Sequence, residues 1–269
     1  MTSWNHTLHY CNWTGVTCGA SNGRVTILNL HSRELVGTIP PSIGNLSSLT
    51  GIDLGNNSLR GGIPQGIGLL LQLQHLNLSF NYFSGNIPTN LTYCEELRVL
   101  DLQFNDLVGK IVDQLSSLSK LNFLKLKRNS HRRHPTLYFS VTQNLLHGQL
   151  PADVRLTLPN LIVFAGAVNS FTGPIPVSLA NASKLHVIDF SQNKLIGDVP
   201  TSFGKLKTLV RLNFEANRLG GRGTYEGLKF LDFLTNCTNL MVLSFATNNF
   251  RGEVPYSITN LSTVLRYFL

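Results

Sequence analysis

The sequence predicts an α/β repeat fold, a curved right-handed superhelix of stacked coils with a parallel β-sheet on its concave face. Two columns of residues predict it. Asparagines recur with a dominant spacing of 24 residues, and seven of the eleven prolines hold one fixed place in the same period. A period of about 20–50 residues is the signature of a solenoid. The asparagines are Asn57, Asn81, Asn105, Asn129, Asn144, Asn169, Asn193, Asn217 and Asn248, and the prolines are Pro40, Pro64, Pro88, Pro151, Pro176, Pro200 and Pro255.

Each period contains one short strand. In the segment LQHLNLSFN, Leu76 and Leu78 alternate with polar Asn77 and Ser79, which is the period of a half-buried strand. Parallel stacking of such strands buries the leucines, and the amide of the column asparagine can bond to backbone groups of neighbouring coils. Glycine permits the turn that follows, and proline fixes φ where no N–H is needed. The pattern predicts a leucine-rich repeat solenoid of about ten coils.

Composition excludes several other classes. Of the 269 residues, 42% are apolar and 13% are charged, so the chain is not intrinsically disordered. The apolar run Leu69–Leu71 is far shorter than the roughly 20 residues that span a bilayer. The N-terminal segment MTSWNHTLHYCNW lacks the apolar core of a secretory signal. We therefore expect neither a membrane span nor a readable signal peptide in this chain.

The turns and the N-terminal segment resemble a known family. GTIP at 37–40, GGIP at 61–64, GNIP at 85–88 and GPIP at 173–176 are similar to the plant-specific leucine-rich repeat. SWNHTLHYCNWTGVTC at 3–18 resembles the second half of the N-terminal cap of plant receptor-like kinase ectodomains. The repeats at 146–176 and 230–250 look closest to the immune-receptor group that includes the flagellin and elongation-factor receptors.

This resemblance covers residues 3–269 and implies a partial cap over 1–24, followed by repeats over 25–269. It implies a disulfide between Cys11 and Cys18. It also implies a parent protein at the plasma membrane, with its repeats on the extracellular face and a transmembrane helix and Ser/Thr kinase beyond them. Cys94 and Cys237 each precede the first leucine of a repeat, and we expect both to be buried free thiols.

Three segments depart from the period. The step of 15 residues between positions 129 and 144 is too short for a coil and indicates either a junction at which sequence was lost or an irregular loop. The step of 31 residues between positions 217 and 248 contains Leu228, Leu231 and Leu234 at helical spacing, which predicts a short helix on the convex side. The final repeat opens a strand at Val264 that is not completed.

Sequons of the form Asn-x-Ser/Thr are frequent and fit a protein of the secretory pathway. One of them lies on the predicted concave face, at Asn77, where a glycan would obstruct a ligand. The predicted glycosylation sites are Asn5, Asn12, Asn45, Asn56, Asn77, Asn90, Asn181, Asn236 and Asn260.

No group of residues predicts catalysis, so we expect a protein that is not an enzyme and that holds no cofactor and no metal. His131 and His134 lack a carboxylate or cysteine partner. Asp53, Asp101 and Asp189 lie between strand leucines, where polar residues belong in any case. The basic residues near Arg128 do not predict a nucleic-acid partner, because they cluster where the repeat is broken. An acidic or sulfated peptide suits such a patch better.

The residues between and just after the strand leucines face the concave side, because successive side chains of a strand point to opposite faces. Aromatic and charged residues are densest there between Phe80 and Tyr138, and such residues are the usual interface anchors. The predicted ligand-binding residues are His75, Phe80, Asp101, Gln103, Phe104, Phe123, Lys125, Lys127, Arg128 and Tyr138.

The sequence thus predicts an extracellular receptor module that recognises a peptide or protein signal in plant defence or development. Signalling would need a kinase in the parent protein or a leucine-rich repeat co-receptor kinase. Two alternatives stay open. One is a secreted leucine-rich repeat inhibitor of microbial wall-degrading enzymes, and the other is a non-functional truncated receptor product.

Overall fold

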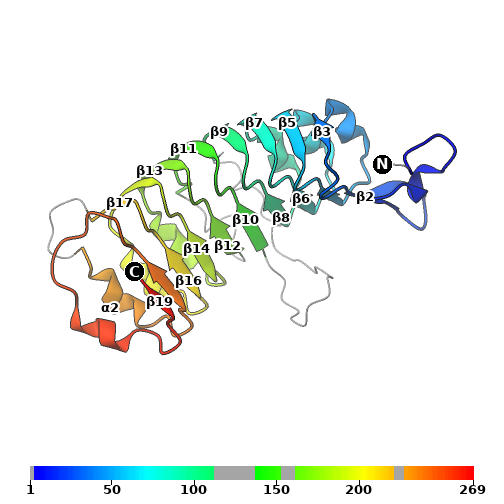
Figure 1. The fold of residues 1–269 in the computed structure, drawn as a ribbon. Helices are drawn as coiled ribbons and strands as arrows, with labels where there is room; N and C mark the ends of the chain where they lie inside the picture. The colour runs from blue at the N-terminus through cyan, green and yellow to red at the C-terminus, as the bar shows by residue number, and fades with distance from the viewer. Residues whose placement is uncertain (1–2, 112–136, 153–160, 221–226) are drawn as a thin grey trace.

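The predicted solenoid is confirmed by a computed structural model, which describes residues 3–111, 137–152, 161–220 and 227–269. The coils stack into an elongated, curved body with the two termini at opposite ends (Figure 1). Neighbouring coils share hydrogen bonds along two sheets, so each coil is held by the one before it and the one after it.

The concave sheet contains one strand from each coil. Its strands are parallel apart from the first pair, β1 and β2, which form an antiparallel hairpin in the cap. In order across the sheet they are β1 (Val16–Cys18), β2 (Val25–Asn29), β4 (Gly51–Asp53), β6 (His75–Asn77), β8 (Val99–Asp101), β10 (Leu137–Ser140), β12 (Leu161–Ala165), β14 (Val187–Asp189), β16 (Arg211–Asn213), β18 (Val242–Ser244) and β19 (Tyr267–Phe268).

A second parallel sheet, which the sequence analysis did not foresee, follows the asparagine column. Its segments were interpreted only as turn residues, yet they alternate between exposed and buried side chains, as in the buried Leu59 of β5. Its strands are β3 (Val36–Gly37), β5 (Ser58–Gly62), β7 (Tyr82–Asn86), β9 (Asp106–Gly109), β11 (Leu145–Gln149), β13 (Ser170–Pro174), β15 (Lys194–Gly197) and β17 (Arg218–Leu219).

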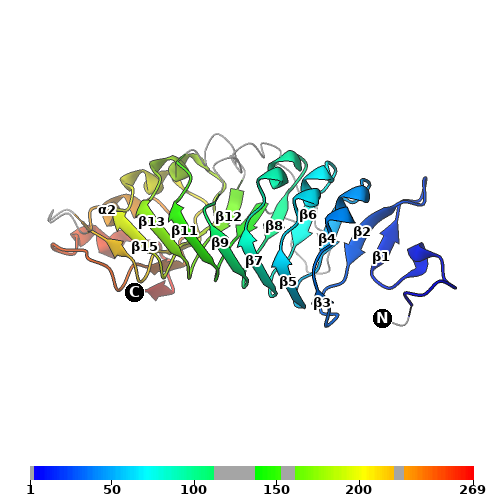
Figure 2. The ribbon, with the colours of Figure 1, turned by 90° about the horizontal axis from the view of Figure 1, so that it is seen from above.

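Short helical turns line one long edge of the solenoid (Figure 2). A column proline stands immediately before most of them, because its fixed φ suits the start of a helix and its missing N–H is not needed there. The 3-10 helices are η1 (Tyr10–Asn12), η2 (Pro41–Asn45), η3 (Gln65–Leu69), η4 (Thr89–Tyr93), η6 (Val177–Asn181), η7 (Thr201–Lys205) and η8 (Tyr256–Asn260).

The helix predicted in the long step between Asn217 and Asn248 is present as α2 (Phe230–Leu234). It packs between η7 and η8 on this helical edge. Phe230, Leu231 and Leu234 are buried, as their helical spacing requires. In this coil an α-helix therefore takes the place of the 3-10 turn.

The column asparagines form a ladder of buried amides along the core. The Nδ2 group of Asn81 donates to the carbonyls of Leu54, Leu78 and Ser79 at 3.0, 3.1 and 3.1 Å. Its Oδ1 accepts from the backbone N–H of Leu59 at 3.0 Å. One side chain thus satisfies four backbone groups in two coils, including groups that no strand pairing reaches.

The ladder passes directly from Asn105 to Asn144. Strand β8 pairs with β10, and Asn144 Nδ2 donates to Leu102 O at 3.1 Å while its Oδ1 accepts from Leu107 N at 3.0 Å. The coil of Asn144 therefore packs on the coil of Asn105, although the two asparagines are more than one period apart in the sequence. Asn129 itself lies outside the described residues.

We predict that Asn105→Ala lowers the free energy of unfolding by about 3 kcal/mol, because it leaves buried carbonyls and the N–H of Phe83 without partners. Chemical denaturation monitored by circular dichroism measures this change. Asn86→Ala is the control, since Asn86 is an exposed residue of the neighbouring second sheet. Equal stability of the two variants would contradict the structural role given to the ladder.

Candidate functional site

The concave face brings six of the predicted ligand-binding residues together. Strands β6, β8 and β10 are adjacent, with His75 opposite Val99 and Val99 opposite Tyr138. In the next row, Asn77 lies opposite Asp101 and Asp101 opposite Ser140. The described members of the predicted set are His75, Phe80, Asp101, Gln103, Phe104 and Tyr138. The others, Phe123, Lys125, Lys127 and Arg128, lie outside the described residues.

An aromatic pair, exposed at Phe80 and half-buried at Phe104, lies at the edge of this face. The rings of Phe80 and Phe104 stack with centroids 4.3 Å apart and an interplanar angle of 12°. Phe80 is 45% exposed, whereas Phe83, three residues later on β7, is fully buried. Stacked aromatic rings that face solvent offer a large apolar area at a small entropy cost, which suits them to binding.

The backbone at both phenylalanines is left-handed, with φ of 54°. Such a conformation is uncommon for a bulky residue. It recurs one residue before each ladder asparagine, so it is a property of the repeat and not a local distortion. The other residues at this place are Asn56, Gln143, Val168, Gln192, Ala216 and Thr247, with φ between 52 and 55°.

Half-buried ionisable groups lie beside the aromatic pair. Asp101 accepts hydrogen bonds from Gln103 N at 3.2 Å and from Gln103 Nε2 at 3.3 Å. Burial, assisted by the charge of Asp53, nevertheless raises the pKa of Asp101 to about 6. Burial also raises the pKa of Tyr138, with the charge of Asp101 acting in the same direction. The pKa of His75 is lowered by burial, which the charge of Asp53 opposes in part.

Asp53 belongs to a hydrogen-bonded row that runs across three coils. Its Oδ1 accepts from Asn77 Nδ2 at 2.9 Å and lies 3.2 Å from Nδ1 of His31. Asn77 is fully engaged, because its Oδ1 accepts from the N–H and the hydroxyl of Ser79. Asp53 and Asp101 are thus separated by the strand of Asn77 and do not form a carboxylate pair for acid–base chemistry.

A second polar group lies farther along the same face. Asp189 on β14 accepts from Arg211 Nε at 3.1 Å and Nη2 at 2.9 Å, and from Asn213 Nδ2 at 3.2 Å. Sequence analysis singled out Asp189 but missed Arg211. The signal was available, since Arg211 opens the next strand and stands opposite Val187 in the register.

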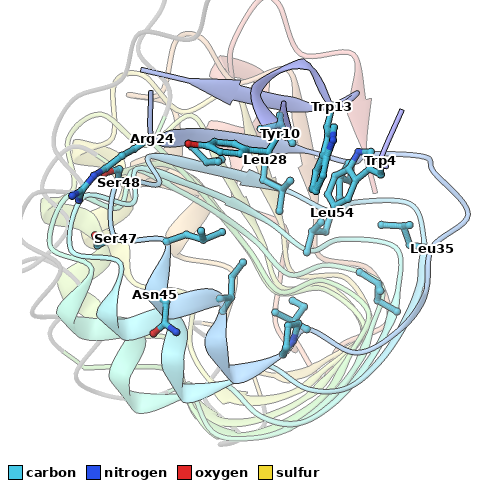
Figure 3. Close-up of a pocket in the computed structure, with 18 of the residues that line it drawn as sticks. Trp4, Tyr10, Trp13, Arg24, Leu28, Leu35, Asn45, Ser47, Ser48 and Leu54 are labelled. Carbon is cyan, nitrogen blue, oxygen red and sulfur yellow. The ribbon is translucent and has the colours of Figure 1, made fainter. Parts of the chain in front are cut away.

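The N-terminal cap contains the predicted Cys11–Cys18 disulfide, which is confirmed. Trp4 and Trp13 stack beside it with centroids 4.9 Å apart. Between the cap and the first coils lies a mostly apolar cavity of about 790 Å³ (Figure 3), with the two tryptophans at one wall and Asn45 at another. Its lining includes core leucines, so it belongs to the end of the core and not to the concave face.

The two remaining cysteines are buried free thiols, as predicted. The Sγ atoms of Cys94 and Cys237 lie against the carbonyls of Ile67 and Phe203 at 3.3 and 3.4 Å. Burial raises the pKa of each thiol to about 11, so neither is a reactive thiolate at neutral pH.

Within the described ranges, no group of three or more His, Cys, Asp or Glu side chains is placed to hold a metal ion. No helix in the same part of the chain is long and apolar enough to cross a membrane.

Comparison with known proteins places the chain in a class. A model of the leucine-rich repeat N-terminal domain matches residues 1–19, and the leucine-rich repeat model matches 48–70, 72–94, 96–118 and 184–206. These matches agree with the leucine-rich repeat solenoid fold that the structure shows. Its homologues are receptor-like kinases and receptor-like proteins of Arabidopsis thaliana, which agrees with the resemblance seen in the sequence.

Two receptor-like kinases of Arabidopsis thaliana illustrate the relation. A probable leucine-rich repeat receptor-like serine/threonine-protein kinase is 57% identical over 54 residues, which is 20% of this chain and 5% of the kinase. The receptor-like kinase EFR is 54% identical over 54 residues, again 20% of this chain and 5% of the relative. The matched segment thus spans only a small part of these proteins.

Solved structures match over almost the whole chain. The ectodomain of the Arabidopsis membrane receptor kinase GASSHO1/SCHENGEN3, in complex with CASPARIAN STRIP INTEGRITY FACTOR 2, gives a TM-score of 0.84 at 31% identity, covering 97% of this chain and 29% of that one. The Arabidopsis receptor kinase HAESA, in complex with the peptide hormone IDA and the co-receptor SERK1, gives 0.77 at 26% identity, covering 99% and 41%.

A plant ice-binding protein shares the fold as well, with a TM-score of 0.77 at 29% identity over 99% of this chain and 78% of that one. The fold alone therefore does not assign a function.

We predict that Asp101→Asn stabilises the protein by about 1–2 kcal/mol at pH 7. In the folded state the pKa of Asp101 is about 6, above its ordinary value of 3.8. Between these values the folded state binds more protons than the unfolded state, so the stability of the parent falls as pH rises from 4 to 6. The gain should shrink toward pH 4, where Asp101 of the folded parent is protonated and as uncharged as the asparagine that replaces it. Thermal unfolding at pH 4 and pH 7 measures both effects. A variant less stable than the parent at pH 7 would contradict this.

The sequons differ in accessibility, which predicts their occupancy. Seven asparagines are exposed, and Asn45, Asn181 and Asn260 end η2, η6 and η8 on the helical edge. Asn77 is half-buried with its amide hydrogen-bonded at both ends. We predict glycans on the helical edge and an unmodified Asn77 when the chain is secreted from plant or insect cells. Glycopeptide mapping of the folded protein checks this, and an occupied Asn77 would contradict it.

Proposed function

We propose that this chain is the ligand-recognition part of an extracellular plant receptor and binds a peptide or protein signal on its concave face. The observation that carries the proposal is the gathering of stacked aromatic rings and half-buried ionisable side chains on strands β6, β8 and β10 and the turns that follow them. Receptor ectodomains of the same fold have been solved in complex with signalling partners, which supports this interpretation.

The proposal gives the chain no catalytic step of its own. The kinase domain belongs to the full-length homologues, and this chain matches their leucine-rich repeat region. A bound signal would be transmitted by a kinase in the same parent protein or by a leucine-rich repeat co-receptor. The site of action would be the outer face of the plasma membrane, and the response would belong to defence or development.

A glycan placed on the concave face tests the proposal. Tyr138→Asn creates the sequon Asn-Phe-Ser on β10, and Val36→Asn creates Asn-Gly-Thr on β3 of the second sheet, where Val36 is 69% exposed. Both variants are secreted from insect cells, and occupancy is confirmed by mass. A random dodecapeptide library displayed on phage is selected on the unmodified protein, and the capture of selected peptides by the variants is compared.

We predict that the Tyr138→Asn glycoform loses capture by at least tenfold, because the glycan covers strands β6 to β10, whereas the Val36→Asn glycoform binds as the parent does. Circular dichroism of both glycoforms controls for folding. If no selected peptide is blocked by the glycan at position 138, the concave face is not the recognition surface and the proposal fails.

A further inference from the structure

The aromatic pair is not explained by the needs of the backbone. The left-handed conformation at positions 80 and 104 favours glycine or asparagine, and the neighbouring coils have Asn56 and Gln143 at the same place. Phenylalanine here has a conformational cost, and its ring gains little burial at Phe80. A stacked pair with exposed area suits contact with an apolar or planar group of another molecule.

The described charges around the pair are negative. Although the chain has a net charge of +8, the concave positions of β4, β6, β8 and β10 contain the carboxylates of Asp53 and Asp101. Asp53 already faces His31. The neighbour of Asp101 on β6 is the uncharged Asn77, and His75, two residues earlier on that strand, has a lowered pKa and is neutral at pH 7. Within the described ranges the Asp101 carboxylate has no ion-pair partner and accepts hydrogen bonds from Gln103.

The spacing of the two features fits one extended peptide. Asp101 and Phe104 are three residues apart along the same coil, a separation of at most about 10 Å in extended chain. A bound peptide in extended conformation covers the same distance in two or three residues. A cation in this half-buried place gains a charge-assisted hydrogen bond that water screens poorly, and an arginine can also stack on an aromatic ring.

We propose that this surface selects peptides in which an arginine or lysine stands two or three residues from an aromatic or apolar side chain. Asp101 holds the cation, and the Phe80–Phe104 stack holds the apolar side chain. This inference rests on the proposed function and adds the chemistry of the ligand to it. It differs from the acidic or sulfated peptide favoured by the sequence, which depended on Lys125, Lys127 and Arg128 outside the described residues.

Two variants each remove one half of the site, and circular dichroism of both controls for folding. Asp101→Asn keeps the shape of the side chain and is predicted above to be more stable than the parent. Phe104→Gly removes the ring while relieving the left-handed backbone. Asp106→Asn is the matched control, because Asp106 is an exposed carboxylate on β9 of the second sheet.

The probe is the phage-displayed dodecapeptide library, selected on the parent protein at pH 7.5, followed by synthetic peptides of the selected sequences in fluorescence polarisation. We expect selected sequences to be enriched in arginine or lysine near an aromatic residue. Affinity should fall at least tenfold for Asp101→Asn and for Phe104→Gly, and for a peptide with its basic residue replaced by alanine. Asp106→Asn should bind as the parent does.

The pH dependence of peptide affinity gives an independent readout. Because Asp101 must be ionised to hold a cation, affinity should fall about tenfold between pH 7 and pH 5 in the parent, and much less in Asp101→Asn. The residues opposite Asp101 are the uncharged Asn77 on β6 and Ser140 on β10. The nearby ionisable groups are His75 and Tyr138, each two residues earlier on those strands, and Asp53 on β4. Protonation of His75 at low pH would repel a cation as well, so the comparison with Asp101→Asn assigns the effect.

Peptides that bind the concave face without a basic residue, or whose affinity Asp101→Asn leaves unchanged, would overturn this inference. The glycan at position 138 would still block them, so the proposed function would survive that result. Selected peptides that the glycan does not block would overturn both.

Discussion

The amide of the ladder asparagine is the interaction on which the remaining structure depends. Parallel strands that end at the same edge leave carbonyls directed into the coil, where water cannot reach them. Each asparagine offers two donors and one acceptor to these groups, as Asn105 does for Leu78, Leu102 and Phe83. Since the partners belong to two coils, the amide fixes the spacing of the coils as well as the end of each strand.

The same interaction shapes the rim of the concave face. To bring its amide inward, the chain takes a left-handed turn one residue earlier, at φ near 54° in every described coil of the ladder. The side chain at that residue is thereby placed at the rim of the concave sheet. The Phe80–Phe104 stack is a consequence of this geometry, because two successive coils present the same kind of ring in the same orientation. The scaffold sets the position, and the residue type is free to vary.

Features that depend on local pattern could be predicted, and features that depend on pairing between coils could not. The asparagine column, the Cys11–Cys18 bond and the helix α2 were visible in spacing or resemblance. The second sheet was missed because its strands are short and contain the turn residues. The direct packing of the Asn144 coil on the Asn105 coil and the Asp189–Arg211 pair were missed for one reason: register between distant segments is fixed only when the coils stack.

Asp101 shows why a solenoid can place an unfavourable group on its concave face. The hydrogen bonds of the asparagine ladder lie on the core side of each strand, and Asp101 takes no part in them. In a repeat protein, stability is close to a sum of terms between neighbouring coils. The cost of a carboxylate with a raised pKa is then confined to the coils of Asn77, Asp101 and Ser140 and does not spread along the body. Side chains with a shifted pKa are therefore informative about function in this fold, because the repeat scaffold does not itself require them.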